Sequence, residues 1–233
     1  LVEEHYRRIF PLMKIRHLFA EAQNFRLYDF ITHNGVNHGV YAYSNRMGAS
    51  RALVIYNNAY EQTAGWFYSS APYLERTEEQ ARHAQETLGD ALALTPKPGY
   101  YLIFHNPIDK LTYIRSSMEI CSKGLYAQLQ GYETQVFINF REVHDQFGLY
   151  HEMASLLQGK GSPNFDHELA LLRLRPLHDW ILPFLEEDQL QLFKRLISGD
   201  VSCLDMVKQR WLALYRGLVR VWNSSFHASG SPL

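Results

Sequence analysis

Cysteine is scarce in this sequence, and the motifs that depend on it are missing. The 233 residues contain two cysteines, Cys121 and Cys203, which form no Cys-x-x-Cys pair. A disulfide framework or a zinc site normally needs several cysteines at short, regular spacings. Two isolated cysteines are typical of small buried side chains in a reducing compartment, so we expect a cytoplasmic protein.

A surplus of positive charge is also missing. The chain has 23 Lys and Arg against 24 Asp and Glu, and its formal net charge is −1. Proteins that bind nucleic acids usually carry a basic patch or stripe, so we expect no nucleic-acid partner. No run approaches the roughly 18 consecutive apolar residues of a spanning helix, and the first ten residues are too charged for a signal peptide, so we expect no membrane partner.

Motifs of metal enzymes and hydrolases are lacking as well. The 11 histidines are scattered and include no His-Glu-x-x-His, and no serine lies in a Gly-x-Ser-x-Gly setting. The acidic pairs at 78–79 and 186–187 fall at predicted helix starts or faces, where carboxylates favour the helix dipole. We therefore expect no metal, no cofactor and no catalytic residue in this chain.

Residues 1–23 predict one amphipathic helix. Apolar side chains recur at roughly helical spacing from Tyr6 to Phe19. Pro11 lies inside this stripe and predicts either a kink or a helix that begins near it. A single helix this short is not stable alone, so its apolar face needs a partner surface.

Residues 24–143 predict a β domain. Residues 40–46 alternate, with Val40 and Ala42 on one face, and the continuous apolar run at 52–56 fits a central strand buried on both faces. The turn at 47–50 would join these two segments in a hairpin. Several short strands joined by turns predict an antiparallel β-sandwich or a barrel.

The end of this region predicts a second hairpin. In residues 125–129 the odd positions are apolar and should face inward, whereas in residues 136–140 the even positions should do so. Gly131 lies between the two segments and predicts the turn that would join them.

A helical insertion interrupts the β pattern at residues 77–94. Thr77 and Gln80 resemble a capping box, and apolar residues from Ala81 to Leu92 recur at helical spacing. The sequence therefore predicts one helix inside the β domain.

Residues 144–233 predict a helical extension. Short connections between its periodic segments fit a small antiparallel bundle, with one helix ending near Pro176. The longest periodic run extends from Leu204 to Trp222, and we interpret its apolar stripe as bundle core. The predicted fold class is α+β: one helix, then an antiparallel β-sandwich, then a small helical bundle.

Four segments occur in the order expected of one known protein family. They are Ile15-Arg16, VYAYSNR at 40–46, RALVIYNN at 51–58 and LQGYETQVF at 129–137. Together they resemble the last barrel helix and the C-terminal β domain, domain C, of the α-amylase superfamily (family 13 glycoside hydrolases). Pro11, the insertion at 77–94 and the extension at 144–233 depart from that pattern, so the resemblance covers residues 1–143.

The resemblance implies a non-catalytic part of a larger enzyme. In that family the catalytic Asp and Glu lie on barrel strands that precede the last barrel helix, so we expect them upstream of Leu1. Residues 1–23 would be the final helix of the missing N-terminal catalytic barrel, and residues 24–143 would be domain C. The parent would be an α-glucan-acting hydrolase or transglycosylase, whose barrel this portion stabilises.

An aromatic cluster offers a possible carbohydrate contact. Tyr60, Trp66 and Tyr68 surround a predicted strand start, and flat rings pack against the C–H faces of sugars. The other interpretation is that these rings fill the core or a domain interface. The alternative for the whole chain is a free-standing carbohydrate-binding or protein-interaction module, whereas an independent hydrolase would need converging acidic groups that this sequence does not offer.

Overall fold

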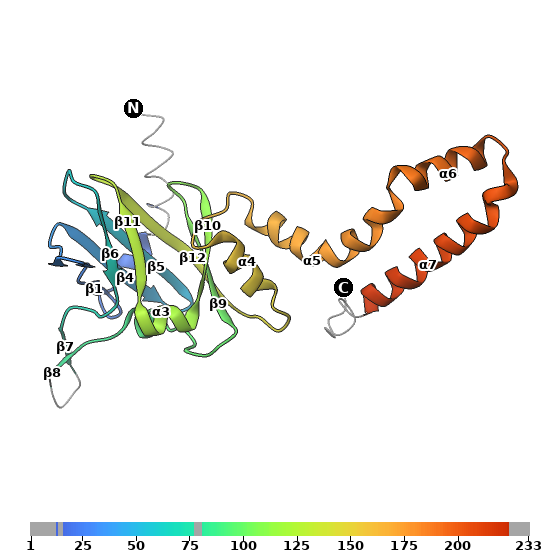
Figure 1. Cartoon of the computed structure of the whole chain (residues 1–233). Helices are drawn as coiled ribbons and strands as arrows, with labels where there is room; N and C mark the ends of the chain where they lie inside the picture. The colour runs from blue at the N-terminus through green and yellow to red at the C-terminus, as the bar shows by residue number, and fades with distance from the viewer. Residues whose placement is uncertain (1–12, 14–15, 77–80, 224–233) are drawn as a thin grey trace. The chain divides into compact units, whose positions relative to one another are not determined.

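The computed structural model describes residues 13, 16–76 and 81–223, and the chain forms two compact units (Figure 1). We call Leu1–Asp166 the β unit and His167–Leu233 the helical unit. The structure confirms the mixed α+β class, with antiparallel sheets and several helices. Of the helix predicted at residues 1–23, most lies outside the described residues; Arg16–Phe19 form a short 3-10 helix, η1.

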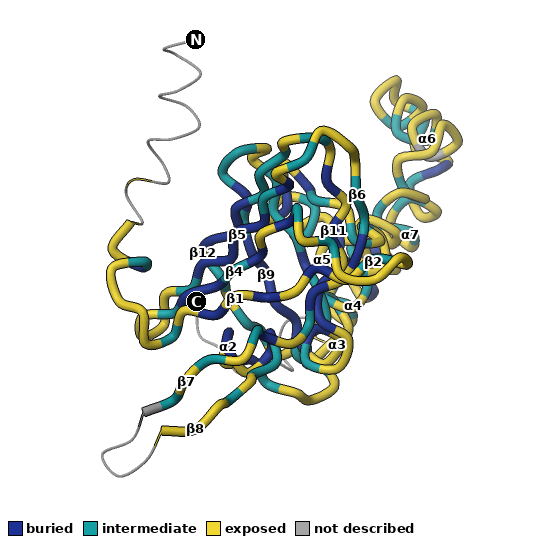
Figure 2. The backbone as a smooth tube through the Cα atoms, turned by 90° about the vertical axis from the view of Figure 1, so that its left-hand side faces the viewer, coloured by how far each residue is buried: buried dark blue, intermediate teal, exposed yellow. Residues whose placement is uncertain are grey.

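The larger sheet of the β unit has six antiparallel strands. Their spatial order is β1 (Arg26–Tyr28), β4 (Val40–Met47), β5 (Ser50–Asn57), β12 (Thr134–His144), β9 (Tyr100–Asn106) and β10 (Leu111–Ser116). The central strands β4, β5, β12 and β9 include its most buried backbone segments (Figure 2). This burial explains why 52–56 is a continuous apolar run rather than an alternating one.

The smaller sheet has four strands. Their order is β11 (Leu125–Leu129), β6 (Thr63–Phe67), β2 (Ile31–Thr32) and β3 (Gly35–Val36). Separate short elements complete the unit: the hairpin of β7 (Tyr73–Arg76) and β8 (Ala81–Ala84), and the helices α2 (Leu88–Ala91), α3 (Ser117–Lys123) and α4 (Leu149–Leu157).

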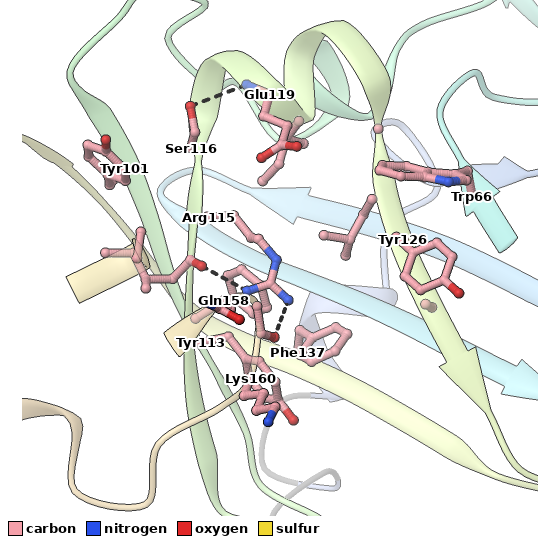
Figure 3. Close-up of a pocket in the computed structure, with 18 of the residues that line it drawn as sticks. Trp66, Tyr101, Tyr113, Arg115, Ser116, Glu119, Tyr126, Phe137, Gln158 and Lys160 are labelled. Carbon is pink, nitrogen blue, oxygen red and sulfur yellow. Dashed lines mark hydrogen bonds between the residues drawn. The ribbon is translucent and has the colours of Figure 1, made fainter. Parts of the chain in front are cut away.

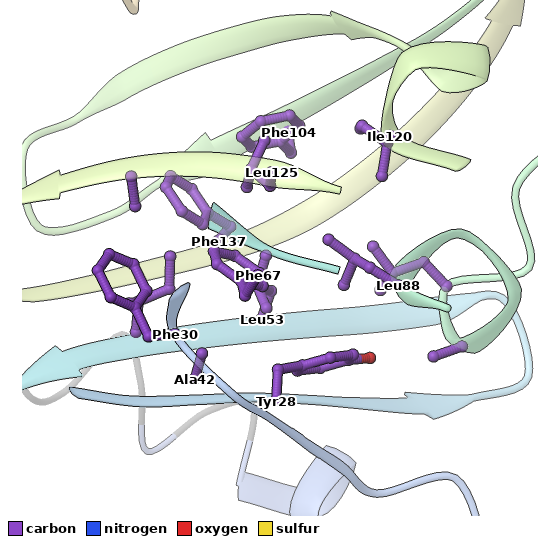
Figure 4. Packing of buried hydrophobic residues seen from close by; sticks show 14 of the residues in the cluster. Tyr28, Phe30, Ala42, Leu53, Phe67, Leu88, Phe104, Ile120, Leu125 and Phe137 are labelled. Carbon is purple, nitrogen blue, oxygen red and sulfur yellow. The ribbon is translucent and has the colours of Figure 1, made fainter. Parts of the chain in front are cut away.

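The two larger sheets share one apolar core (Figure 4). Leu53 and Phe104 of the six-stranded sheet lie in the same cluster as Phe67 and Leu125 of the four-stranded sheet, with Leu88 from α2. Leu53, Phe67 and Leu88 are completely or almost completely buried. Burial of a side chain of this size contributes about 2 kcal/mol, so this cluster is the main source of stability for the β unit.

The predicted hairpin at residues 40–56 is confirmed. Strands β4 and β5 pair in one register from Val40 with Asn57 to Met47 with Ser50. The alternate positions of β5 point to two different clusters: Leu53 joins the main core, whereas Val54 packs with Leu18 of η1 on the opposite face of the sheet. The expectation of a central strand buried on both faces is therefore also confirmed.

The second predicted hairpin is wrong. Strand β11 pairs with β6 in the smaller sheet, whereas β12 pairs with β5 and β9 in the larger one. Gly131 does lie in the connecting turn, but it passes the carbonyl of Tyr60, where a Cβ atom would come within 2.1 Å of the oxygen. This close approach lets the chain cross from one sheet to the other instead of folding back on itself.

The inward pattern of β12 also differs from the prediction. Val136 and Ile138 are buried against Leu18, but Phe137 faces the main core. The ladder with β9 shifts register after Ile138, and Asn139 has a φ of +56°. Such an irregularity inserts an extra residue, so Phe140 packs against the same core as Phe137 although the two are three positions apart.

The helix predicted across residues 77–94 is wrong over most of the described part of that range. Residues 81–84 are strand β8, and the helix α2 covers only Leu88–Ala91. The capping box is formed by Thr87 and Asp90, not by the predicted pair Thr77 and Gln80. Leu88 and Ala91 pack in the main core, whereas Ala81 pairs with Arg76 across the β7–β8 hairpin. The apolar residues that predicted one helix therefore belong to two different elements.

The boundary between the units lies later than the predicted change at residue 144. Helix α4 belongs to the β unit, where its Met153 is 1% exposed. The isolated bridge between Thr112 and Ser162 fastens the next loop to β10, with both N–H···O distances at 2.9 Å. Tertiary contacts thus assign this helix to the sheet that it packs against.

The helical unit contains most of α5 (Phe165–Ile181), then η2 (Leu182–Phe184), α6 (Glu187–Ile197), η3 (Val201–Cys203) and α7 (Leu204–Trp222). Helix α5 continues through Pro176 instead of ending near it, although an interior proline removes one amide donor and its ring crowds the preceding turn. Trp180 of α5 donates its indole N–H to the carbonyl of Leu214 at 3.2 Å, which joins α5 to α7. Among the described residues, no helix has the length and apolar character to cross a membrane.

Candidate functional site

A cleft opens between the edge strands of the two sheets of the β unit. The chain runs directly from β10 through α3 into β11, so one helix joins the edge strand of the six-stranded sheet to the edge strand of the four-stranded sheet. The cleft has a volume of about 940 Å³, and α4 with the loop after it contributes part of the wall. This volume lies within the range of small-molecule sites, roughly 300–1,000 Å³.

The ends of α3 fix how far apart the two edges lie. The hydroxyl of Ser116 accepts a hydrogen bond from the amide of Glu119 at the start of the helix. Gly124 ends the helix with a φ of +79°, and a Cβ there would lie 2.2 Å from the carbonyl oxygen of Phe67. Only glycine fits that approach, so the helix delivers β11 directly against β6.

The floor of the cleft is apolar and belongs to the main core. Phe104 and Phe137 meet edge to face at 5.0 Å between ring centroids, and Tyr113 stacks on Phe104 at 5.7 Å. Burial, followed by the hydrogen bond that the Tyr113 hydroxyl donates to Asp109 at 2.7 Å, raises the pKa of Tyr113. That hydroxyl therefore stays protonated and acts as a donor at neutral pH.

Two aromatic rings stand together on the β6 and β11 side of the cleft. Trp66 and Tyr126 are direct cross-strand partners, and their ring centroids are 5.4 Å apart (Figure 3). Their neighbours along the strands, Gly65, Phe67, Leu125 and Ala127, are buried, so the alternation of the sheet turns these two rings outward. They are 39% and 49% exposed, which leaves ring surface available to a ligand.

Across the cleft from these rings lies one guanidinium group (Figure 3). Arg115 of β10 donates to the carbonyls of Ile114 at 2.8 Å and Gly159 at 2.5 Å. Burial lowers the pKa of Arg115, with the charges of Glu119 and Tyr113 acting in the opposite sense, but a guanidinium still remains charged. Two of its five N–H groups are used by these carbonyls, and the other three have no acceptor among the described residues.

The remaining polar lining consists mainly of neutral groups. Gln128, Gln135 and Gln158 offer amide donors and acceptors, and Tyr101 shares a hydrogen bond of 2.8 Å with Nδ1 of His151. Among the described lining residues, Glu119 is the single carboxylate. Glycosidases use two carboxyl groups between about 5 and 9.5 Å apart, a pair that this lining does not supply. The part of the chain that the structure describes contains no group of three or more His, Cys, Asp or Glu able to hold a metal ion.

The structure separates the three aromatic residues that the sequence grouped together. Trp66 lines the cleft, but Tyr60 and Tyr68 do not. Tyr60 lies in the loop between β5 and β6 and is 80% exposed, and Tyr68 follows the end of β6 and is half-buried. None of the three belongs to the apolar core cluster.

Tyr126 and Arg115 were not identified from the sequence as site residues. The alternation in residues 125–129 already predicts that Tyr126 faces outward, so its exposure was accessible from the pattern alone. Its position beside Trp66 was not, because that depends on the pairing of β11 with β6 across about 60 residues of chain. Arg115 gave no local signal.

Comparison with known proteins identifies no relative. No protein-family model matches the chain, and no curated protein and no solved structure is significantly similar to it. The resemblance to the α-amylase superfamily therefore stays a prediction, and the geometry of the cleft carries the functional argument.

Proposed function

We propose that the β unit is a non-catalytic carbohydrate-binding module whose site is the cleft between β10 and β11. The observation that carries this proposal is the pair of exposed rings, Trp66 and Tyr126, at the side of a cleft lined with amides and a guanidinium. Aromatic faces pack against the C–H faces of sugar rings, and the polar groups around them suit hydroxyls. A cleft of about 940 Å³ has room for more than one sugar ring.

The ligand class that we propose is an α-glucan, and the context is a larger enzyme of the α-amylase superfamily. The confirmed β4–β5 hairpin, which carries two of the segments quoted for that family, supports this assignment. The two sheets that share one core suit the two layers of a domain C-like β-sandwich. The packing of Leu18 on the outer face of β5 and β12 suits a chain that enters from a preceding catalytic barrel.

Calorimetric titration of the full chain with maltoheptaose tests the proposed site. Trp66→Ala and Tyr126→Ala should each weaken binding about tenfold, because each removes an exposed ring that the sugar would cover. Tyr60→Ala is the matched control: it also removes an exposed ring beside β6, but one outside the cleft, and it should leave the affinity unchanged. Absence of any heat with the unaltered chain, or equal loss in all three variants, would refute the cleft as a carbohydrate site.

The proposed lack of catalysis has its own test. The purified chain should release no reducing sugar from soluble starch, because its cleft presents one carboxylate where hydrolysis needs a pair. Measurable turnover by the pure chain would overturn this part of the proposal.

The coding sequence upstream of Leu1 tests the parent: it should encode a barrel with spaced Asp and Glu motifs. The two unpaired thiols, Cys121 and Cys203, support a cytoplasmic location.

A further inference from the structure

The helical unit contains an apolar cavity of about 200 Å³ that is partly open to solvent. Its walls come from the end of α5 with the following turn, from α6 and from α7. Of the ten described residues that line it, nine are apolar and the tenth is Arg210. Phe193 and Trp211 meet edge to face across α6 and α7, with ring centroids 6.0 Å apart. All of these residues lie between 167 and 223, so the cavity belongs to the helical unit alone.

Arg210 is the feature of this cavity that needs an explanation. Its Nη1 atom is buried, and it has no hydrogen-bond partner among the described residues. Arg210 also forms no ion pair with any of the described residues. The nearest acidic residue along α7 is Asp205, five positions away, where the helical period places it on a different face.

A buried and unpaired guanidinium N–H is costly, because it has lost water and gained no acceptor. Arg210 lines the cavity, so a ligand that brings an anionic oxygen to its guanidinium would, after a small shift of the side chain, give this group an acceptor. The planar fork of arginine matches a carboxylate in two parallel hydrogen bonds, which makes a carboxylate the complementary group. An apolar cavity of roughly 150 Å³ accommodates benzene, so one of 200 Å³ suits a chain of about six to ten carbon atoms.

We propose that this cavity binds a medium-chain carboxylate, with the hydrocarbon chain among the apolar walls and the carboxylate on Arg210. A neutral hydrocarbon would leave the guanidinium unpaired, and a sugar would leave its own hydroxyls without partners in an apolar lining. The proposal is independent of the carbohydrate site, since the two rest on different residues in different units.

Calorimetric titration of the full chain with hexanoate, octanoate, decanoate and decanol tests the proposal. Each added pair of methylenes should tighten carboxylate binding about 15-fold until the cavity is full. Decanol should bind at least tenfold more weakly than decanoate, because it lacks the charge-assisted hydrogen bonds to Arg210. All titrations are run below the concentrations at which these ligands form micelles.

Variants on α7 assign the effect to one residue. Arg210→Gln should abolish the preference for decanoate over decanol, and Arg210→Lys should retain part of it because the positive charge remains. Arg216→Gln is the matched control, since Arg216 lies on the same helix but is exposed, and it should bind as the unaltered chain does. Helical circular dichroism checks that each variant is folded, and Arg210→Lys keeps the test decisive if Arg210→Gln does not fold.

Four results would overturn the proposal. The first is an equal affinity for decanoate and decanol, and the second is full decanoate affinity in Arg210→Gln. The third is no binding of decanoate by a chain that sedimentation shows to be self-associated, which would assign the cavity to an interface between copies. Absence of binding by a monomeric chain would equally rule out a medium-chain carboxylate.

Discussion

Arg26 and Glu86 form the ion pair that joins β1 to the segment after the β7–β8 hairpin. The Nε of Arg26 donates to Glu86 at 3.0 Å and its Nη2 does so at 3.2 Å, which gives a two-point contact. Tyr73 adds a hydrogen bond of 2.8 Å to the same carboxylate, and its ring lies 3.7 Å below the guanidinium carbon. The Arg26 side chain is 9% exposed and that of Glu86 is 34% exposed.

Glu86→Gln removes the charge but keeps the size of the side chain. Breaking a fully buried pair costs about 3–5 kcal/mol, because the remaining charge has no partner. Since Glu86 is one-third exposed, water screens part of this effect, and we expect the free energy of unfolding to fall by about 2 kcal/mol. Two backbone carbonyls, those of Gln23 and Phe25, still accept from Arg26 and prevent a larger loss.

Urea unfolding of the full chain measures this change, with hydrogen exchange of β4 and β5 amides used to report on the β unit separately. The matched control is Glu75→Gln in the Arg82–Glu75 pair of the same hairpin. The Arg82 side chain is 73% exposed and that of Glu75 is 39% exposed, so this substitution should change stability by less than about 0.5 kcal/mol. If Glu86→Gln costs no more than Glu75→Gln, the reasoning from burial is refuted.

Three further substitutions test other parts of the fold. Gly217→Ala should destabilise the helical unit by about 1–3 kcal/mol in thermal unfolding, because a Cβ there would lie 2.0 Å from the ring of Trp180; an unchanged melting temperature would contradict this packing. Gly124→Ala should destabilise the β unit by at least about 1 kcal/mol and weaken maltoheptaose binding, since it forces β11 away from β6; normal stability would show that the turn tolerates a side chain. Burial alone would raise the pKa of Glu142, but the hydrogen bonds that it accepts from the amide and hydroxyl of Thr95, at 2.9 and 2.8 Å, hold that pKa below its ordinary value of 4.5. A carboxylate whose pKa is lower in the folded than in the unfolded state stabilises the fold at high pH, and this stabilisation is lost as the pH falls through the folded-state pKa. Glu142→Gln should therefore have a lower free energy of unfolding than the unaltered chain at pH 7, and the difference between the two should shrink below about pH 4.5. A difference that stays constant from pH 7 to pH 3 would exclude this linkage.

Part of the candidate site was accessible from local pattern. The outward positions of Trp66 and Tyr126 follow from alternation with buried neighbours. Tyr60 and Tyr68 were grouped with Trp66 because the three are near in sequence, whereas the structure places only Trp66 in the cleft. Tyr60 precedes β6 and Tyr68 follows it, so the five-residue strand stands between them. Arg115 could not be chosen from the other arginines, because its role depends on the cleft around it.

The sequence by itself determined where short-range order lies. Apolar alternation and the turn at residues 47–50 specified the β4–β5 hairpin, and helical periodicity specified α4 and α7, because both patterns are set within a few neighbouring residues. Only the tertiary structure decided which strands meet across long separations. Gly124 and Gly131 permit backbone approaches that no side chain would allow, and those approaches place β11 beside β6 rather than beside β12. Because such contacts join residues far apart in the chain, their choice rests on packing of the whole core, and the cleft between β10 and β11 is a consequence of it.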